Sequence, residues 1–304
     1  MYLVTGGGGF IGSHLCDALL ARGERVRVLD DLSTGKRDNV PNGAELLVGD
    51  VADPAAVRDA TAGIQGCFHL AAIASVARGM EDWLGTHRAN LTGTITVLDA
   101  LRGRDVPVVY ASSAAVYGDC RVRPIPEDAP LRPLSAYGAD KLGCELHARV
   151  ATHVHGIPTA GLRFFNVYGP RQDPSSPYSG VISIFCERLR AGRSIQIYGD
   201  GGQTRDFVYV ADVVAALLAA MDARPGGAPV LNVCTGHATS VRALAETIGA
   251  VLGHEPEVEH GPSRPGDIRE SVGDNAKLRQ SLGVAPSTAL DDGLAQVVRW
   301  MNRS

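Results

Sequence analysis

The chain has 304 residues, of which 45% are hydrophobic and 20% are charged, and its formal net charge is -4. This composition is typical of a globular protein with a large core, built as one large domain or two closely packed ones. The mild acidity and the lack of a long Lys or Arg run argue against nucleic acid or a membrane surface as the main partner.

The N-terminus and the cysteines narrow the class further. Met1 leads directly into Tyr2-Leu3-Val4, without the basic and then apolar pattern of a signal peptide, and no apolar run reaches the roughly 18 residues of a membrane span. The six cysteines are scattered, and neither they nor the nine histidines show the spacing of a disulfide framework or a metal site. We therefore expect a cytoplasmic protein without a bound metal.

Short apolar runs alternate with helical stretches through the first half of the chain. The expected strands are 2–4, 26–29, 45–48, 67–71, 108–111 and 159–164, and the expected helices among them include 11–21, 53–60 and 90–101. This alternation predicts an α/β fold with a doubly wound parallel Rossmann sheet.

The second half is less regular. Its expected strands are 195–198, 207–210 and 230–233, and its expected helices are 182–191, 212–222, 240–252 and 289–300. A stretch rich in Pro and Gly at 169–180 is the expected crossing between the two halves. We predict a smaller, mixed α/β substrate-binding region here.

A run of glycines follows the first expected strand and opens the first expected helix. It can be read as GxGxxG, with Gly7, Gly9 and Gly12, or as GxxGxxG, which begins at Gly6. Glycines let the chain turn tightly and approach a pyrophosphate closely, while the helix N-terminus supplies N–H donors. A flexible loop also collects glycines, so the pattern alone leaves both interpretations open.

Carboxylates follow the second and third expected strands. Asp30 and Asp31 stand about 20 residues after the glycines, where a carboxylate accepts the adenosine ribose hydroxyls and repels a 2′-phosphate. Asp50 ends the third strand, where it either meets adenine or caps a turn. The order of strand, glycines and acids predicts a dinucleotide site that prefers NAD to NADP.

Ser113 follows the strand expected at 108–111, and Tyr137 and Lys141 come shortly after it. Positions four apart share one helix face. A free phenol, with a pKa of about 10, is a poor base near neutrality, but a nearby ammonium and a positively charged nicotinamide both favour the phenolate. Tyr137 is the candidate general base, and Ser113 would hydrogen-bond the same reacting oxygen. A solvated helix face is the alternative interpretation of this spacing.

Several longer motifs accompany these residues. They are TGGGGFIG (5–12), DDLSTG (30–35), HLAA (69–72), ASSAAVYG (111–118), YGADK (137–141), LRFFNVYGPR (162–171), GDGGQTRDFVYV (199–210) and RPGD (264–267). With them, essentially the whole chain resembles the extended short-chain dehydrogenase/reductases, specifically the UDP-glucose 4-epimerase group. The resemblance implies NAD as cofactor, a UDP-sugar as substrate, and Ser113, Tyr137 and Lys141 as the catalytic triad.

The resemblance also implies which residues bind the cofactor and the substrate. The cofactor-binding residues are Gly6, Gly9, Phe10, Ile11, Gly12, Asp30, Asp31, Ser33, Asp50, Val51, Leu70, Ala71, Ala72, Tyr137 and Lys141. The substrate-binding residues are Ser113, Tyr137, Asn166, Arg171, Arg205, Arg264 and Ser271. Asn166 would touch the sugar diphosphate, and Arg205 and Arg264 would each fork onto its phosphate oxygens. An ordinary surface salt bridge is the alternative for either arginine.

By the same resemblance, residues 1–168 form an NAD-binding Rossmann domain that includes the catalytic triad. Residues 169–304 form a mainly nucleotide-sugar-binding domain, with some chain crossing between the two. Members of this group often dimerise through two helices from each subunit, so we expect a homodimer that uses residues 92–101 and 139–152.

The residues after Ser113 restrict the reaction. Related dehydratases carry an acidic pair there and related decarboxylases a glutamate, whereas this chain has Ala114 and Ala115. Oxidation at C4 to a 4-keto sugar, followed by return of the hydride to the opposite face, is what the remaining groups can do. The chain is therefore predicted to be a UDP-hexose 4-epimerase, an isomerase.

The sugar is predicted by rank. Ser271 stands where some epimerases of this group have a bulky Tyr, which leaves room for an N-acetyl group unless Ser271 is merely a small loop residue. Asn166 and Asp173 replace the Thr and Arg of one class of UDP-glucuronate epimerases, although Arg171 could contact a carboxylate. UDP-glucose/UDP-galactose comes first, the UDP-N-acetylhexosamines second, and UDP-glucuronate/galacturonate third.

Two rival functions remain. A nucleotide-sugar dehydrogenase or reductase of the same family would catalyse net redox and exchange its cofactor with solvent. A non-catalytic NAD-sensing regulator would typically lose the Tyr or the Lys, and this chain retains both.

Overall fold

The strands of the first half assemble into one parallel sheet. The computed structural model describes residues 1–173, 180–224, 226–263 and 268–303, and within these ranges the sheet has seven strands. In spatial order they are β3 (Glu45–Val48), β2 (Val26–Asp30), β1 (Tyr2–Thr5), β4 (Gly66–His69), β5 (Val108–Ser113), β6 (Thr159–Phe164) and β11 (Val230–Val233). Every neighbouring pair is parallel. The predicted doubly wound Rossmann sheet is confirmed.

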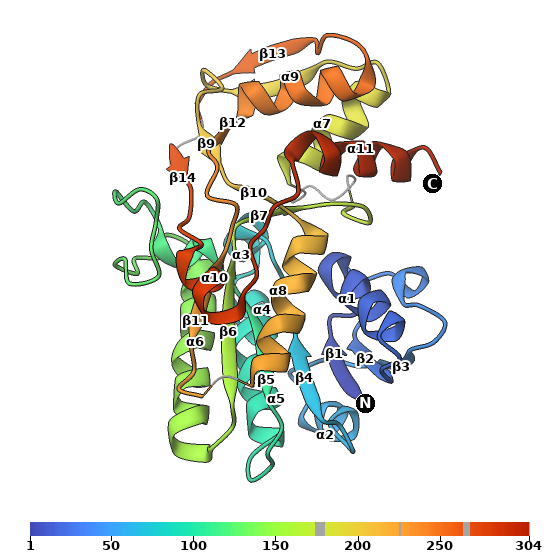
Figure 1. Ribbon diagram of the computed structural model, residues 1–304, viewed down its shortest axis with the longest axis vertical. Coiled ribbons are helices and arrows are strands. Elements are labelled where there is room, and N and C mark those ends of the chain that lie inside the picture. Colours follow the sequence, from blue (N-terminus) through green and yellow to red (C-terminus); the bar gives the residue numbers. More distant parts are fainter. Residues whose placement is uncertain (174–179, 225, 264–267, 304) are drawn as a thin grey trace.

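Helices cover both faces of this sheet (Figure 1). One face packs against α1 (Phe10–Ala21), α8 (Val210–Ala223) and α10 (Ala276–Leu282). The other face packs against α2 (Pro54–Ala60), α5 (Gly93–Ala100) and α6 (Ala136–His155). Strand order reverses between β1 and β4, so the carboxyl ends of these two strands form the crevice where such sheets bind ligands.

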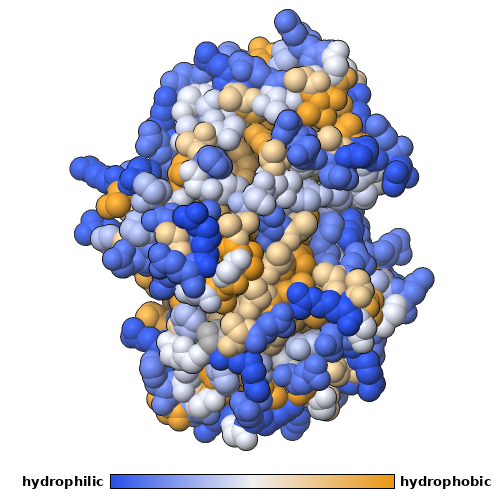
Figure 2. Space-filling view, in the orientation of Figure 1, coloured by the Kyte–Doolittle hydropathy of each residue, from blue (hydrophilic) through white to orange (hydrophobic). Residues whose placement is uncertain are grey.

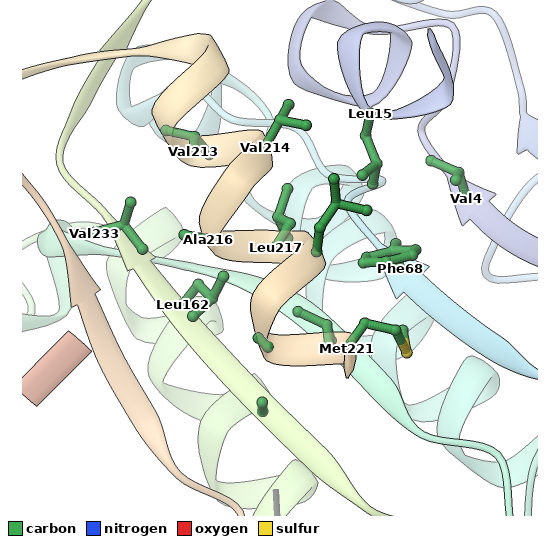
Figure 3. Packing of buried hydrophobic residues seen from close by; sticks show 14 of the residues in the cluster. Val4, Leu15, Phe68, Leu162, Val213, Val214, Ala216, Leu217, Met221 and Val233 are labelled. Atoms are coloured by element: carbon green, nitrogen blue, oxygen red, sulfur yellow. The ribbon is translucent and has the colours of Figure 1, made fainter. Parts of the chain in front are cut away.

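The apolar strands are explained by burial on both faces. Successive residues of β1 belong to different cores: Leu3 packs with α2 and α5, and Val4 packs with α1 and α8. Figure 3 shows Leu217 of α8 facing Leu15 of α1 and Phe68 of β4. α8 therefore packs against the large sheet, although it follows the domain boundary predicted at residue 168.

Short elements connect these layers. They are η1 (Arg37–Asn39), α3 (Val76–Glu81), α4 (Trp83–His87), the π-helical turn η2 (Arg88–Thr92) that leads into α5, and η3 (Ala114–Tyr117) after β5. No helix in the described ranges is long and apolar enough to cross a membrane.

The C-terminal region encloses a second core. It contains α7 (Val181–Arg190), β8 (Ile195–Tyr198), α9 (Val241–Leu252), β13 (Val258–Gly261) and α11 (Leu290–Met301). Smaller ladders link it to the sheet: β7 (Asn166–Tyr168) pairs with β10 (Phe207–Tyr209), and β9 (Thr204–Arg205) pairs with β12 (Thr239–Ser240) and β14 (Glu270–Ser271). In the orientation of Figure 1, Figure 2 shows apolar residues gathered in the middle of the view, where α8 runs below this region.

Most expected elements lie within two residues of the observed ones. The helix expected at 90–101 departs further, because residues 88–92 form the π-helical turn η2 and α5 begins only at Gly93. The strand expected at 207–210 ends at Tyr209 because Val210 begins α8. β11 lies in the large sheet although it falls in the C-terminal half. The expected crossing at 169–180 lies partly outside the described residues. The division at residue 168 into cofactor and substrate domains stays a prediction.

Candidate active site

The glycine turn between β1 and α1 leaves no room for side chains. Gly6 has φ +73°, and a Cβ there would lie 2.7 Å from the backbone nitrogen of Ala71. A Cβ on Gly12 would lie 2.2 Å from the carbonyl oxygen of Gly6. Both positions need glycine, because backbone from β1, α1 and the end of β4 meets here.

The N-terminus of α1 is the part of this turn that fits a phosphate group. Gly9 precedes Phe10, and no side chain in the described ranges caps the helix there. The first-turn N–H groups of a helix have no partner within the helix and favour an anion. Phe10, Ile11 and Gly12 form this first turn, so the turn and the helix dipole together fit a dinucleotide pyrophosphate.

The two acids after β2 take different positions. Asp30 is almost fully buried and accepts hydrogen bonds from the backbone N–H groups of Gly8 (2.8 Å) and Leu32 (2.9 Å), and burial raises its pKa. Asp31 is exposed and accepts from the backbone N–H and the hydroxyl of Ser33 (2.9 and 2.6 Å). Asp30 therefore also fixes the glycine turn, whereas Asp31 is the carboxylate open to solvent.

The ends of β3 and β4 bring further predicted cofactor residues to the same edge of the sheet. Asp50 accepts a hydrogen bond from the N–H of Ala52 (2.8 Å), as a turn cap does, and also pairs with Arg88 (2.9 Å). Val51 is buried under α5, where a Cβ on Gly93 would lie 2.7 Å from its methyl carbon. Both interpretations of Asp50 are thus compatible with its position.

A buried histidine organises the segment after β4. Thr5 Oγ1 accepts from the N–H groups of Leu70 and Ala71 (both 3.2 Å), so its hydroxyl hydrogen is available to His69 Nδ1 at 2.8 Å. His69 Nε2 lies 3.0 Å from Thr94 Oγ1. Burial lowers the pKa of His69 to about 3, so the ring is neutral at physiological pH. Thr5 therefore holds Leu70 and Ala71, which Ala72 follows, beside the glycine turn, and His69 fixes the direction of the Thr5 hydroxyl.

The three predicted catalytic residues come from β5 and α6. Ser113 ends β5, is half-buried, and accepts from the N–H of Ala115 (3.1 Å). Lys141 is 4% exposed, and its Nζ donates to the carbonyl oxygen of Ala111 (2.9 Å) and lies 5.9 Å from the ring centroid of Tyr137. The ammonium is thus held beside the phenol and behind the end of β5.

Gly138 explains how α6 approaches this strand end. A Cβ at Gly138 would lie 2.7 Å from the carbonyl oxygen of Ala115. The first turn of α6, which carries Tyr137, therefore packs directly on the backbone of η3. Ser135 caps the helix by accepting from the N–H of Gly138 (3.1 Å).

The predicted substrate residues are placed by the smaller ladders. Arg205 on β9 and Ser271 on β14 are Cα partners, and the Arg205 guanidinium donates to the carbonyl oxygen of Ile268 (2.7 Å). Asn166 begins β7 and is exposed. Arg264 lies outside the described residues.

Arg171 is directed toward α1 in this structure. Its guanidinium donates to Asp17 Oδ2 (2.6 Å) and to His14 Nδ1 (3.0 Å), and its backbone has φ +68°. Asp173 pairs with Lys36 of the loop after β2 (3.0 Å). The 170–173 segment is therefore attached both to α1 and to the loop after β2. Contact of Arg171 with substrate stays a prediction.

One buried acid received no role from sequence reasoning. Asp206, between β9 and β10, is fully buried and accepts from the N–H groups of Thr235 (2.7 Å), Gly236 (2.8 Å) and Gly273 (3.4 Å). It ties the segment after β11 to the segment after β14, next to Arg205. The sequence feature that could have drawn attention to Asp206 is its place in the TRDFVY motif (204–209).

This fold and these residues define an enzyme of the extended short-chain dehydrogenase/reductase type. The chain belongs to the NAD-dependent epimerase/dehydratase family, whose model matches residues 2–234. NAD is accordingly its cofactor, and the glycine turn and uncapped α1 described above fit that group.

Comparison with individual proteins agrees with this assignment. A UDP-glucose 4-epimerase of Mycolicibacterium smegmatis is 40% identical over 98% of this chain and 97% of its own length. The structure of Thermotoga maritima UDP-glucose 4-epimerase with UDP-glucose matches with a TM-score of 0.95 and 36% identity, covering 99% of this chain and 98% of that one. A Methanobrevibacter ruminantium UDP-N-acetylglucosamine 4-epimerase, in complex with UDP-N-acetylmuramic acid, also has a TM-score of 0.95, at 34% identity and the same coverage.

Proposed function

We propose that this protein is an NAD-dependent 4-epimerase of a UDP-hexose. The observation that carries the proposal is the arrangement at the end of β5: Ser113, with Tyr137 and Lys141 on the adjoining helix, and alanines at 114 and 115. A base and a hydrogen-bond donor for a hydroxyl are present, whereas the acids that elimination or decarboxylation needs at those two positions are missing.

The mechanism follows from the three side chains. Tyr137, as phenolate, removes the proton of the C4 hydroxyl, and the Lys141 ammonium stabilises that phenolate. The Ser113 hydroxyl hydrogen-bonds the same oxygen and orients it. NAD held at the glycine turn and the N-terminus of α1 would supply the hydride acceptor and then the hydride donor for C4, while the protein retains the 4-keto sugar. Tyr137 reprotonates the oxygen after the sugar has turned, and no net redox results.

The nucleotide diphosphate holds the substrate while the hexose turns. Asn166, Arg205 and Arg264 are the proposed contacts, and binding energy from this remote part retains the otherwise loosely held intermediate. Arg205 is anchored by a backbone carbonyl, which would limit the entropy lost when it binds a phosphate.

We rank UDP-glucose/UDP-galactose first, because the Mycolicibacterium and Thermotoga proteins carry that name. The N-acetylhexosamines come second, supported by Ser271 and by the Methanobrevibacter protein. The uronates come third, since Arg171, the candidate for a C6 carboxylate, is engaged by Asp17.

The test is to incubate the purified protein, without added cofactor, with UDP-glucose, UDP-N-acetylglucosamine and UDP-glucuronate separately, and to follow the H4 and anomeric protons by NMR. Conversion to the galacto epimer, lost in Tyr137→Phe, supports the proposal and identifies the sugar. When NAD is then added, the alternative, a one-way dehydrogenase, would reduce it in proportion to the substrate and form no epimer.

We also propose a homodimer built on α5 and α6. Leu146, Val150 and Val154 lie at successive i, i+4 positions of α6 and are 49%, 49% and 68% exposed, and Ile95 on α5 is 38% exposed. Such an apolar stripe on adjacent helices is typical of a helix-bundle interface.

A further inference from the structure

A buried ion pair joins α6, which carries Tyr137 and Lys141, to β6, the strand next to β5. Arg163 of β6 and Glu145 of α6 are joined by two hydrogen bonds, from Nε to Oε1 (2.8 Å) and from Nη2 to Oε2 (2.7 Å). Their side chains are 4% and 6% exposed. A desolvated pair of charges often contributes little net stability. The role of this pair is therefore better judged from the elements that its hydrogen bonds connect.

Glu145 connects the two elements that carry the catalytic groups. It follows Tyr137 and Lys141 at i+8 and i+4, so the three share one face of α6. Glu145 Oε1 also accepts a 2.5 Å hydrogen bond from the hydroxyl of Ser112, the neighbour of Ser113. With the bond from Lys141 to Ala111, two consecutive residues before Ser113 are fixed to α6.

Arg163 extends the connection away from α6. Its Nη1 donates to the Tyr117 hydroxyl (2.7 Å) and to the carbonyl oxygen of Glu127 (2.9 Å), and the guanidinium stacks 4.8 Å from the Tyr117 ring centroid. The Tyr117 hydroxyl donates to Asn232 Oδ1 on β11 (2.7 Å). The pair therefore holds η3, which follows Ser113, against β6 and β11.

We infer that Glu145 and Arg163 are positioning residues that fix Tyr137 and Lys141 relative to Ser113. This inference rests on the proposed function for its kinetic consequence. Proton transfer to or from a substrate oxygen requires donor and acceptor at hydrogen-bond distance, and a misplacement of about 1 Å costs on the order of 100-fold in rate. The planar, two-point contact of Arg with Glu supplies an orientation that a Lys or a single hydrogen bond would not.

Glu145→Gln removes the charge and one of the strong bonds to Arg163. We expect kcat to fall about 10- to 100-fold while KM and bound NAD stay within about twofold, because Arg205, Asn166 and the glycine turn are untouched. Leu217→Ala, in the α8 core, is the control matched for loss of thermal stability, and its kcat should equal that of the wild type below its melting temperature.

The double variant Glu145→Met/Arg163→Met separates positioning from stability. Removing both charges leaves no unpaired buried ion, so the melting temperature should recover relative to Glu145→Gln, while kcat stays low because the contacts to Ser112 and Tyr117 are lost. A double variant with wild-type kcat would overturn the inference.

Amide hydrogen exchange gives a second readout that does not depend on the substrate. In Glu145→Gln, exchange should rise in residues 111–117 and 136–141 above the level of Leu217→Ala. Equal exchange in the two variants would overturn the inference even if the wild type acted on no UDP-hexose. Wild-type inactivity, in contrast, would refute only the proposed function.

Discussion

Gly12→Ala is the substitution whose effect the structure specifies most narrowly. The new methyl carbon would lie 2.2 Å from the carbonyl oxygen of Gly6, whereas ordinary contacts of such a carbon begin at 3.4 Å. The first turn of α1 must therefore move by about 1.2 Å from the glycine turn. Overpacking of this kind costs about 1–3 kcal/mol, and since the same N–H groups would bind the pyrophosphate, NAD affinity should fall roughly 10- to 100-fold.

The assay is isothermal titration of NAD into protein stripped of nucleotide, together with the NAD content of the protein as purified. Gly226→Ala is the matched control, because no heavy atom of the described residues, its chain neighbours aside, lies within 4 Å of the added carbon, and its φ is not in the left-handed region. Wild-type NAD affinity in Gly12→Ala would refute the assignment of this turn to the pyrophosphate.

Three further predictions concern other parts of the molecule. Lys141→Met should lower kcat at least about 100-fold in the NMR assay, and a kcat within threefold of wild type would contradict its role. Burial lowers the pKa of His69 to about 3, so the unfolded chain takes up a proton there below pH 6.5 while the folded chain does not. This proton uptake lowers the free energy of unfolding by about 2 kcal/mol at pH 5. In urea titrations at fixed NAD, His69→Gln should therefore lose less stability than the wild type between pH 7.5 and 5. Val150→Asp should convert a wild-type dimer into a monomer on size-exclusion chromatography, and a monomeric wild type at micromolar concentration would refute the α5–α6 interface.

The sequence was most informative where periodicity is strong. The strands of the large sheet are apolar because they are buried on both faces. Their alternation with helices is enough to predict that they run parallel. Elements of two or three residues, such as β9, β12 and β14, have no periodicity to detect. They exist because the segments around Asp206 and Arg205 pack together, which is a tertiary effect.

The candidate site was predictable to a different degree for each residue. Ser113, Tyr137 and Lys141 follow from motif and helix spacing, and the structure brings their elements together. Arg171 could not be placed from sequence, since its direction depends on a left-handed backbone conformation. The pairing of Glu145 with Arg163 was equally hidden, because the two residues are 18 positions apart and lie on elements joined only in the fold.

The most direct test of the account is epimerisation of UDP-glucose deuterated at C4, with the protein as purified and no added cofactor. Transfer within one active site predicts UDP-galactose that retains the deuterium at C4, with no lasting absorbance at 340 nm. Loss of the label to solvent, or NADH that accumulates in proportion to substrate, would contradict 4-epimerisation through a bound 4-keto sugar.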